Sequence, residues 1–572
     1  MLRYILTLAG VFLLYGSAQA QQEDLHFRSI FRNAVELFSG KTLDKPSLDK
    51  LIYLMPQNSL RDLPSATGSA EDYLQMLNHR FATEKITTKD LYENGVAATP
   101  AADDFQLLES RLAESDTMIV IVPGVFGEFI KTYPFSEVLL KDASVFKELW
   151  LRKTAAAVDA KDKTDDQAAL KNVSDVNSAG ISPVPLKDLF LVNSIDFAGQ
   201  ARVKVVLFKT PSMSLETLGD QEELARRFNR RLSKMFRVLG ETPKNVVLLG
   251  YSRGTAVGLE MLSRAKKEKL PWLGNVKAMV SLGGVVFGSA LADNAVINNE
   301  SNEYKEMQLL KNLATSLKPE RRHALGNFAK YFEFASGMIR IMQPQNTSPL
   351  KSLREFYTMM ERGPMRTDPR AAVSLAILQF KEFGLQLGDF SSDQYEQDIK
   401  RFKLFVSAVS TAVEQLSTPS GMAWWKKNIL PKAVNYYTVS AAMAEKTSEL
   451  VNNRLGYNPE SPDFNSLSDN WEAFRNINFS SLYRGNYLND SQVAWQKTHL
   501  WPELVTLLNP ANSDLKSTHL ATLGTHHWGL ALKVVNAVSP GQVASGQLLD
   551  GNPFPREALL YSIALATVAG KQ

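Results

Sequence analysis

Four short runs of apolar, mostly β-branched residues constrain the fold of this chain more than any other feature. The first run, Thr117 to Val122, reads Thr-Met-Ile-Val-Ile-Val and is stopped by Pro123-Gly124. A short run without polar alternation predicts a strand that is buried on both faces and ended by a turn. Runs of the same kind follow at residues 203–208, 245–249 and 276–282. Such strands need a layer of structure on each side.

An amphipathic helix is predicted over residues 221–239, between the second and third runs. Its apolar stripe is formed by Leu224, Phe228, Leu232, Phe236 and Leu239. We interpret the basic side chains of this helix as its solvated opposite face, namely Arg226, Arg227, Arg230, Arg231 and Lys234. Buried strands that alternate with such helices describe the α/β class, a mostly parallel sheet with helices on both faces.

The strand pattern gives way to helical spacing from about residue 297 to residue 475. One apolar stripe in this block is formed by Phe402, Phe405, Val406, Val409, Val413 and Leu416. The strand pattern returns at residues 520–523, and Pro555 opens a final helix through Val568. We therefore predict a helical segment at 21–116 and an α/β core in two parts, separated by a large all-helical cap. The core parts span 117–296 and 476–572, and the cap spans 297–475.

The first twenty residues are typical of a secretory signal. Arg3 supplies a positive charge, residues 5–15 are apolar, and Ala18-Gln19-Ala20 offers small side chains to a signal peptidase. A membrane anchor is the alternative, but the apolar stretch is shorter than the ~18 residues that span a bilayer. We expect a mature protein that begins near Gln21 and is secreted or periplasmic, because an exported chain without cysteine fits a bacterial envelope.

Charge and cysteine content exclude several classes of function. The 64 Lys and Arg against 60 Asp and Glu leave a net charge of +4, which is too slight for a dedicated nucleic-acid binder. The chain has no cysteine, so it has no disulfide, thiolate metal site or cysteine nucleophile. With 44% hydrophobic and 22% charged residues, it has the composition of an ordinary globular protein.

The third apolar run leads directly into Gly250-Tyr251-Ser252-Arg253-Gly254, and a helix is predicted over residues 255–264. Strand, Gly-x-Ser-x-Gly and helix in this order form a nucleophile elbow. A sharp turn at Ser252 presses its neighbours two positions away against the strand and the helix, where a β-carbon would clash. The turn presents the hydroxyl beside the positive end of the helix, where a developing oxyanion is stabilised.

A serine nucleophile needs a general base, and the elbow's usual chain order of Ser, acid and His points downstream. The downstream histidines are His323, His499, His519, His526 and His527. We interpret His323 as a surface residue because Arg321 and Arg322 precede it. The pair His526 and His527 follows the strand predicted at 520–523, where a catalytic histidine belongs. We prefer His527 as the general base, with His526 as the alternative. A metal site at this pair is disfavoured, since no further ligands stand at suitable spacing.

The acid is predicted to be Asp490. It lies in Asn489-Asp490-Ser491-Gln492-Val493, a polar loop between the helical block and the histidines. An aspartate there holds the imidazole tautomer and stabilises its charged form. The competing acids are Asp514, Glu503 and Asp293.

An oxyanion hole needs two donors near the nucleophile. One is predicted to be the backbone N–H of Arg253, the residue after the serine, and the other comes from the loop after an earlier strand. That loop begins Pro123-Gly124-Val125-Phe126-Gly127, where glycines allow close approach to a substrate oxygen. The second donor is therefore the N–H of Val125 or Phe126.

Two further segments match known sequences. Residues 288–293 read Gly-Ser-Ala-Leu-Ala-Asp, and residues 489–493 read Asn-Asp-Ser-Gln-Val. With the elbow, they resemble the α/β-hydrolase superfamily, and within it the bacterial lipases, whose corresponding segments are Gly-Ser-x-x-Ala-Asp and Asn-Asp-Gly-x-Val around the catalytic acid. The predicted cap sits where those lipases insert a lid.

The chain also departs from the lipase pattern. Pro123-Gly124 replaces the usual His-Gly, Val285-Val286 stands where Pro-His is common, Ser491 replaces glycine, and the cap is larger than usual. The matched segments cover about 60 residues, so the resemblance implies a mechanism better than a substrate.

The residues and the resemblance together predict an exported serine hydrolase that cleaves carboxylic esters with Ser252, His527 and Asp490. No metal or other cofactor is needed for this chemistry. The same three residues would serve an acyltransferase, a thioesterase or an amidase. A third hypothesis is a binding or envelope protein on a hydrolase scaffold, which the size of the cap favours and the Ser, Asp and His set disfavours.

Apolar stripes in the predicted cap favour a lipid ester as substrate. They are formed by Met338, Ile339, Ile341 and Met342, and by Trp424, Trp425, Lys426, Lys427, Ile429 and Leu430. An apolar surface with an aromatic and cationic edge suits a lipid interface, although such stripes more commonly pack between helices. We expect a small-molecule or lipid ester substrate, a transient contact with a membrane surface, and no nucleic acid partner.

Overall fold

The computed structural model describes the residues that build the central part of the molecule. These are residues 27–38, 52–53, 68–84, 102–124, 135, 190–197, 201–210, 216–239, 242–289, 292–293, 411–412, 414–442, 488–490, 492–525, 527–531 and 554–569. The predicted signal at 1–20 and most of the predicted cap lie outside the described residues. None of the described helices is both long and apolar enough to pass through a bilayer.

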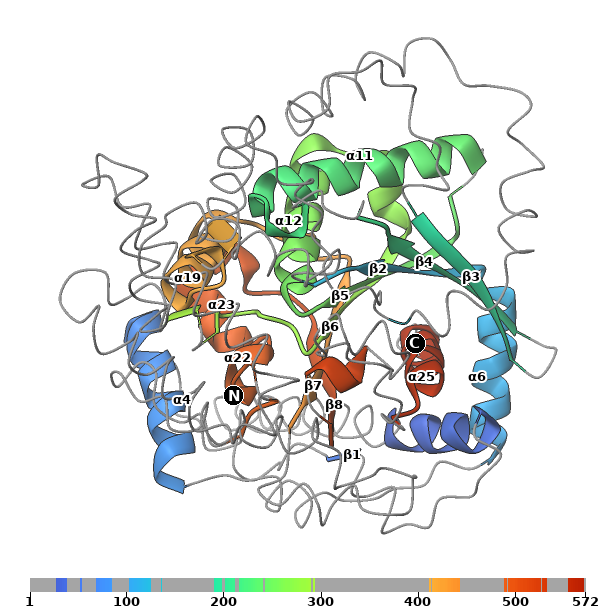
Figure 1. Cartoon of the computed structure of the whole chain (residues 1–572), viewed down its shortest axis with the longest axis horizontal. Helices are drawn as coiled ribbons and strands as arrows, with labels where there is room; N and C mark the ends of the chain where they lie inside the picture. The colour runs from blue at the N-terminus through green and yellow to red at the C-terminus, as the bar shows by residue number, and fades with distance from the viewer. Residues whose placement is uncertain are drawn as a thin grey trace, which may run out of the picture.

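The described strands form one eight-stranded sheet in the order β1-β8-β7-β6-β5-β2-β4-β3 (Figure 1). The strands are β1 (Ile52–Tyr53), β2 (Thr117–Val122), β3 (Phe190–Phe197), β4 (Ala201–Phe208), β5 (Asn245–Tyr251), β6 (Val276–Leu282), β7 (Asn435–Ala441) and β8 (Ser517–Leu523). The strands from β4 to β8 in this order are parallel, while the edge strands β1 and β3 are antiparallel to their neighbours. The segments that follow β2, β5, β6 and β8 therefore all leave the sheet at the carboxyl ends of the strands, which form one common edge. Open α/β sheets place their sites at this edge.

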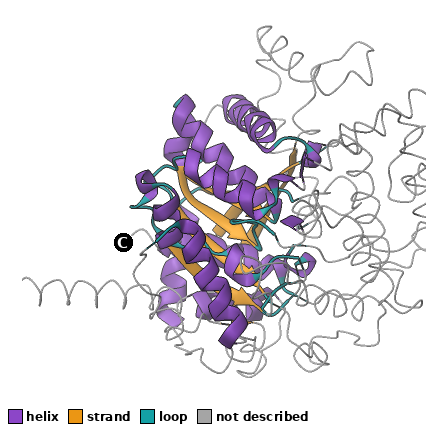
Figure 2. Ribbon diagram, turned by 90° about the vertical axis from the view of Figure 1, so that its left-hand side faces the viewer, coloured by secondary structure: helices purple, strands orange, loops and turns teal. Residues whose placement is uncertain are grey.

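Helices cover both faces of this sheet (Figures 1 and 2). One face packs against α4 (Ala70–Glu84), α11 (Gln221–Leu239), α12 (Arg253–Glu268), α19 (Thr418–Lys427), α22 (Trp495–Thr498) and α23 (Pro502–Leu508). The other face packs against the helix at residues 27–38, α6 (Ala102–Glu114) and α25 (Arg556–Ala569). Short 3₁₀ turns lie at Glu216–Leu218, Pro271–Asn275, Pro510–Asn512 and Trp528–Leu530.

The strand β2 shows how the sequence builds two cores at once. All six of its residues are buried. Met118, Val120 and Val122 face the core that contains α11 and α12, whereas Ile119 and Ile121 face the core that contains α6 and α25. Successive side chains of a strand point to opposite faces, so a continuous apolar run serves both layers.

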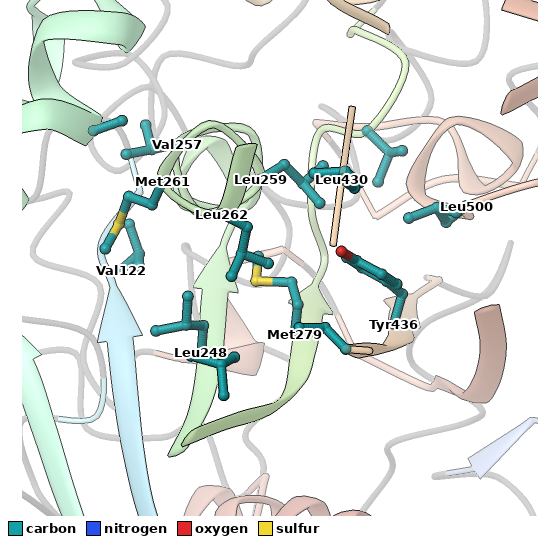
Figure 3. Packing of buried hydrophobic residues seen from close by; sticks show 14 of the residues in the cluster. Val122, Leu248, Val257, Leu259, Met261, Leu262, Met279, Leu430, Tyr436 and Leu500 are labelled. Carbon is teal, nitrogen blue, oxygen red and sulfur yellow. The ribbon is translucent and has the colours of Figure 1, made fainter. Parts of the chain in front are cut away.

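The helix α12 lies close against the sheet because a glycine faces it. A Cβ at Gly258 would lie 2.6 Å from the Met279 methyl carbon. Figure 3 shows Met279 beside Leu248 of the sheet and Leu262 of the helix. This close packing fixes the N-terminus of α12 at the end of β5, where the elbow was predicted.

The α/β class predicted from the sequence is confirmed. The strands expected at 117–122 and 276–282 and the helix expected at 221–239 have those bounds, while β5 extends two residues further and α12 begins at Arg253 rather than at residue 255. The edge strands β3 and β1 were not predicted. β3 (Phe-Leu-Val-Asn-Ser-Ile-Asp-Phe) carries polar residues, and two-residue β1 is too short to leave a pattern.

The expectation of helices throughout 297–475 is wrong at β7, which lies inside the sheet between β6 and β8. Its sequence Asn-Tyr-Tyr-Thr-Val-Ser-Ala is too polar for the buried-strand pattern. Tertiary partners satisfy the hydroxyls: Thr438 Oγ1 lies 3.0 Å from His519 Nδ1, and Ser440 Oγ lies 2.6 Å from Thr498 Oγ1. Polar residues with such partners tolerate burial. Residues 294–410 and 443–487 lie outside the described part, and the cap there stays a prediction.

Two of the side chains that suggested a lipid-facing surface belong to the core. Trp425 and Leu430 are fully buried, and the Trp425 indole donates to the Val286 carbonyl oxygen at 3.1 Å. Trp424 is partly buried and donates to the Glu260 carboxylate at 2.5 Å, which leaves Ile429 as an exposed apolar side chain of this stripe. The pattern was that of packing between α19 and the rest of the core.

Candidate active site

Ser252 occupies the single position between β5 and α12. Its backbone has φ 56° and ψ −128°, a positive-φ conformation that residues with a side chain rarely adopt. Its side chain is half-buried, while its neighbours Tyr251 and Arg253 are buried. Strain of this kind costs about 1–3 kcal/mol and persists only where the surroundings enforce it.

Close backbone contacts enforce this turn. A Cβ at Gly250 would lie 2.4 Å from the Thr255 Cα, and a Cβ at Gly254 would lie 2.1 Å from the Val122 carbonyl oxygen. Both distances are far inside van der Waals contact, so only glycine fits at these two positions. The clash predicted from the sequence for the two glycines of the elbow is therefore confirmed.

The loop after β2 lies against the serine. A Cβ at Gly124 would lie 2.9 Å from the Ser252 Cβ and 3.2 Å from the Tyr251 carbonyl oxygen. This contact places the start of the predicted oxyanion loop beside the elbow. Val125 and Phe126 lie outside the described residues, so the second N–H donor stays a prediction. Arg253 opens α12, whose first turn points its N–H groups toward the serine end of the helix.

The Arg253 side chain is buried and ties the elbow to two other segments. Its guanidinium donates to the carbonyl oxygens of Thr217 and, at 2.6 Å, of Gly219. It also donates to Gln415 Oε1 at 2.7 Å, and the Gln415 amide donates in turn to Asp220 at 2.6 Å. These bonds hold the first turn of α12 against the segment before α11 and the residues that precede α19.

His527 and Asp490 form a buried pair. His527 Nδ1 lies 2.6 Å from Asp490 Oδ2, and both side chains are at most 1% exposed. The His527 N–H also donates to the Asp490 carbonyl oxygen at 2.8 Å. The structure thus brings together the two residues that chain order suggested.

The remaining atoms of the pair are held in place by their surroundings. Asp490 Oδ1 accepts hydrogen bonds from the N–H groups of Gln492 at 2.9 Å and Val493 at 2.8 Å. The Tyr251 hydroxyl donates to the His527 carbonyl oxygen at 3.0 Å, and the two rings lie 5.4 Å apart. Burial and the Asp490 carboxylate raise the pKa of Tyr251, so its phenol stays protonated as a donor.

The pair and the serine meet at the common edge of the sheet. The Ser252 N–H donates to the Leu282 carbonyl oxygen at 3.1 Å. A Cβ at the next residue, Gly283, would lie 3.6 Å from His527 Nδ1 and 3.7 Å from Asp490 Oδ2. No hydrogen bond joins His527 Nε2 to the Ser252 hydroxyl: this buried nitrogen has no hydrogen-bond partner among the described residues.

The competing acids have other partners. Asp293 is buried against Lys497 at 3.0 Å, and Asp514 pairs with Lys432 at the surface. The Glu503 carboxylate lies near Tyr73 of α4, and burial together with this charge raises the pKa of Tyr73. The rings of His499 and of His519 on β8 lie 3.9 Å apart and tilted by 41°. His323 and His526 lie outside the described residues. Among the residues that the structure describes, no three potential ligands gather for a metal ion.

Comparison with known proteins adds little to this geometry. No protein-family model matches the chain, and no curated protein matches it. One similar solved structure is the crystal structure of a metagenomic carboxyl esterase, with a TM-score of 0.32 and 13% sequence identity over 80% of this chain and 76% of that chain.

Proposed function

We propose that this chain is a serine hydrolase of carboxylic esters with an α/β-hydrolase core. The observation that carries the proposal is a buried Asp490–His527 pair beside a serine that a glycine-flanked turn holds at positive φ. Ser252 is the nucleophile, His527 the general base and Asp490 the residue that orients the imidazole.

The mechanism assigns a task to each atom of the pair. With its proton on Nδ1, donated to Asp490, His527 keeps Nε2 as a proton acceptor. Ser252 Oγ attacks the acyl carbon while Nε2 takes its proton, and the imidazolium then protonates the leaving alcohol. In the second half, water attacks the acyl carbon and passes one proton to Nε2. The acyl–Oγ bond then breaks, the imidazolium returns the proton to Ser252 Oγ, and the carboxylic acid leaves.

The open Nε2 supports this cycle. A buried ring nitrogen without a hydrogen-bond partner costs free energy, so it favours a transient hydrogen bond during turnover. Catalytic hydrogen bonds are commonly long without substrate and tighten in the complex. The substrate carbonyl oxygen binds the N–H of Arg253 and that of Val125 or Phe126 in this proposal.

Covalent labelling of the serine tests the proposal. The purified full chain is treated with a fluorophosphonate probe, and the labelled peptide is mapped by mass spectrometry. We expect the label on Ser252, no label in Ser252→Ala, and normal labelling in Ser263→Ala, a matched change on α12 away from the elbow. Hydrolysis of p-nitrophenyl esters of rising chain length then defines the acyl preference. Labelling that persists in Ser252→Ala would overturn the assignment.

A further inference from the structure

A second buried polar cluster lies beside the proposed triad. Lys497 Nζ lies 3.0 Å from Asp293 Oδ2, and these side chains are 1% and 0% exposed. Lys497 Nζ also donates to Thr418 Oγ1 at 2.7 Å. Thr418 in turn donates to Asp293 through its N–H at 2.5 Å and its hydroxyl at 2.6 Å. The cluster is a closed triangle of an anion, a cation and a hydroxyl.

The three members come from three different segments. Asp293 follows the loop after β6, Thr418 opens α19, and Lys497 belongs to α22, seven positions after Asp490. Asp293 and Thr418 stand 125 positions apart in the sequence, and Asp293 and Lys497 stand 204 apart. The cluster therefore joins Asp293, which precedes the predicted cap, and Thr418, which lies within it, to the segment that carries the proposed acid.

Further hydrogen bonds join the segment after β6 to the segment that carries Asp490 and Lys497. The N–H groups of Val286 and Phe287 donate to the Lys497 carbonyl oxygen at 3.3 and 3.2 Å. The Ser289 hydroxyl donates to the Gln492 carbonyl oxygen at 2.8 Å, and the Gln492 N–H binds Asp490. Ser289 thus contacts the acid loop, while Val286, Phe287 and Asp293 contact Lys497 of α22.

That segment is also bound to the elbow. The Val285 N–H donates to the Ser252 carbonyl oxygen at 3.3 Å. Residues 285–289 therefore contact the serine backbone, Lys497 and the Asp490 loop in turn, and Asp293 binds Lys497 again. These contacts connect the serine backbone to the loop that carries Asp490.

A buried ion pair is a weak source of folding stability, because the cost of removing both charges from water offsets their attraction. Such a pair is better suited to specifying one arrangement of the segments that carry it. We propose that Asp293 and Lys497 are a positioning pair, which holds the Asp490 loop in register with the elbow so that His527 stays aligned for proton transfer. The proposal rests on the proposed hydrolase function for its kinetic consequence, but not for its structural one.

Four variants separate positioning from stability. Lys497→Met leaves the Asp293 carboxylate buried without its cation. Asp293→Asn with Lys497→Met removes both charges, while the asparagine oxygen still accepts the Thr418 N–H. Leu232→Ala on α11 opens a cavity in the core far from the acid loop, and Lys432→Met breaks the exposed ion pair with Asp514.

The variants are measured by p-nitrophenyl ester kinetics, urea unfolding and proton NMR of the His527 Nδ1–H, whose downfield resonance is assigned with His527→Ala. We expect Lys497→Met to lower kcat by about 10- to 100-fold with little change in KM, as small misplacements do. The double variant regains the urea midpoint but neither kcat nor the wild-type resonance. Leu232→Ala lowers the midpoint alone, and Lys432→Met changes none of the three.

Two results would overturn the positioning role. Recovery of kcat and resonance together with stability in the double variant means that the pair serves folding only. A loss of kcat in Leu232→Ala equal to that in Lys497→Met means that activity merely follows stability. If the wild-type chain hydrolyses no ester and takes no probe, the proposed function fails, and the resonance in the variants still decides whether the pair positions His527.

Discussion

Asp490 and His527 are joined twice, by a side-chain hydrogen bond of 2.6 Å and by a main-chain hydrogen bond of 2.8 Å from the His527 N–H to the Asp490 carbonyl oxygen. The main-chain bond holds the His527 backbone against that of Asp490, and the side-chain bond sets the orientation of the imidazole ring. The two residues are 37 positions apart and approach the sheet edge from different loops. Their pairing therefore depends on the fold as a whole.

Asp490→Asn tests the tautomer that this pair imposes. The amide keeps the geometry but donates toward Nδ1, which moves the ring proton to Nε2 and removes the general base. We expect kcat to fall by about 10⁴-fold with folding intact, as in other triads. Asp514→Asn, at the surface, is the matched control and should leave ester kinetics unchanged. Equal activity of the two variants would contradict the role of Asp490.

Ser252→Gly and Ser252→Ala separate backbone strain from chemistry. Both variants lack the hydroxyl, so both should lose ester hydrolysis by several orders of magnitude. Glycine adopts a φ of 56° without strain, whereas alanine does not. We expect Ser252→Gly to unfold with a free energy about 1 kcal/mol higher than Ser252→Ala in urea. Equal stabilities would show that the turn stores no strain.

Gly254→Ala tests the close approach of α12 to β2. Its Cβ would lie 2.1 Å from the Val122 carbonyl oxygen, so the helix or the strand must shift. We expect a loss of about 3 kcal/mol in the free energy of unfolding, together with a lower kcat. Gly274→Ala is the control, because no atom lies within 4 Å of its Cβ position. An undisturbed Gly254→Ala variant would show that the elbow is looser than this contact requires.

The neighbouring histidines His499 and His519 predict a loss of stability in mild acid. Burial lowers the pKa of His519 to about 3 and that of His499 well below its usual value. In the unfolded chain both titrate near 6.5, so below that pH the unfolded state binds protons that the folded state does not. Stability therefore falls as pH drops from 6.5 toward 3, by up to about 1.4 kcal/mol per pH unit for each histidine.

Urea unfolding between pH 7 and pH 5 measures this slope. His519→Gln is expected to reduce it, because a side chain that does not titrate takes up no proton on unfolding. A slope identical to that of the wild-type chain would contradict the assignment to this pair.

N-terminal sequencing tests the predicted export signal. The charged start, apolar stretch and Ala18-Gln19-Ala20 predict cleavage after Ala20. We expect the secreted or periplasmic form to begin at Gln21. A cytoplasmic protein that begins at Met1 would contradict the prediction.

Local sequence was sufficient for the features whose causes are local. The run at 117–122 had to be a strand buried on both faces, because it offers no polar side to water. The stripe at 221–239 had to be a helix that covers the sheet, and Gly250 and Gly254 marked a turn that no other residue permits. These patterns were enough to predict the α/β class and to single out Ser252.

Features that depend on distant partners were decided only by the tertiary structure. β7 is too polar to be recognised as a buried strand until His519 and Thr498 satisfy its hydroxyls. Asp293 and Asp490 are both buried aspartates, and local sequence offered both as candidate acids, with Asp490 preferred for its surroundings. Asp293 meets a lysine 204 positions away and Asp490 meets His527, because a buried carboxylate must find a partner and the fold determines which partner is within reach.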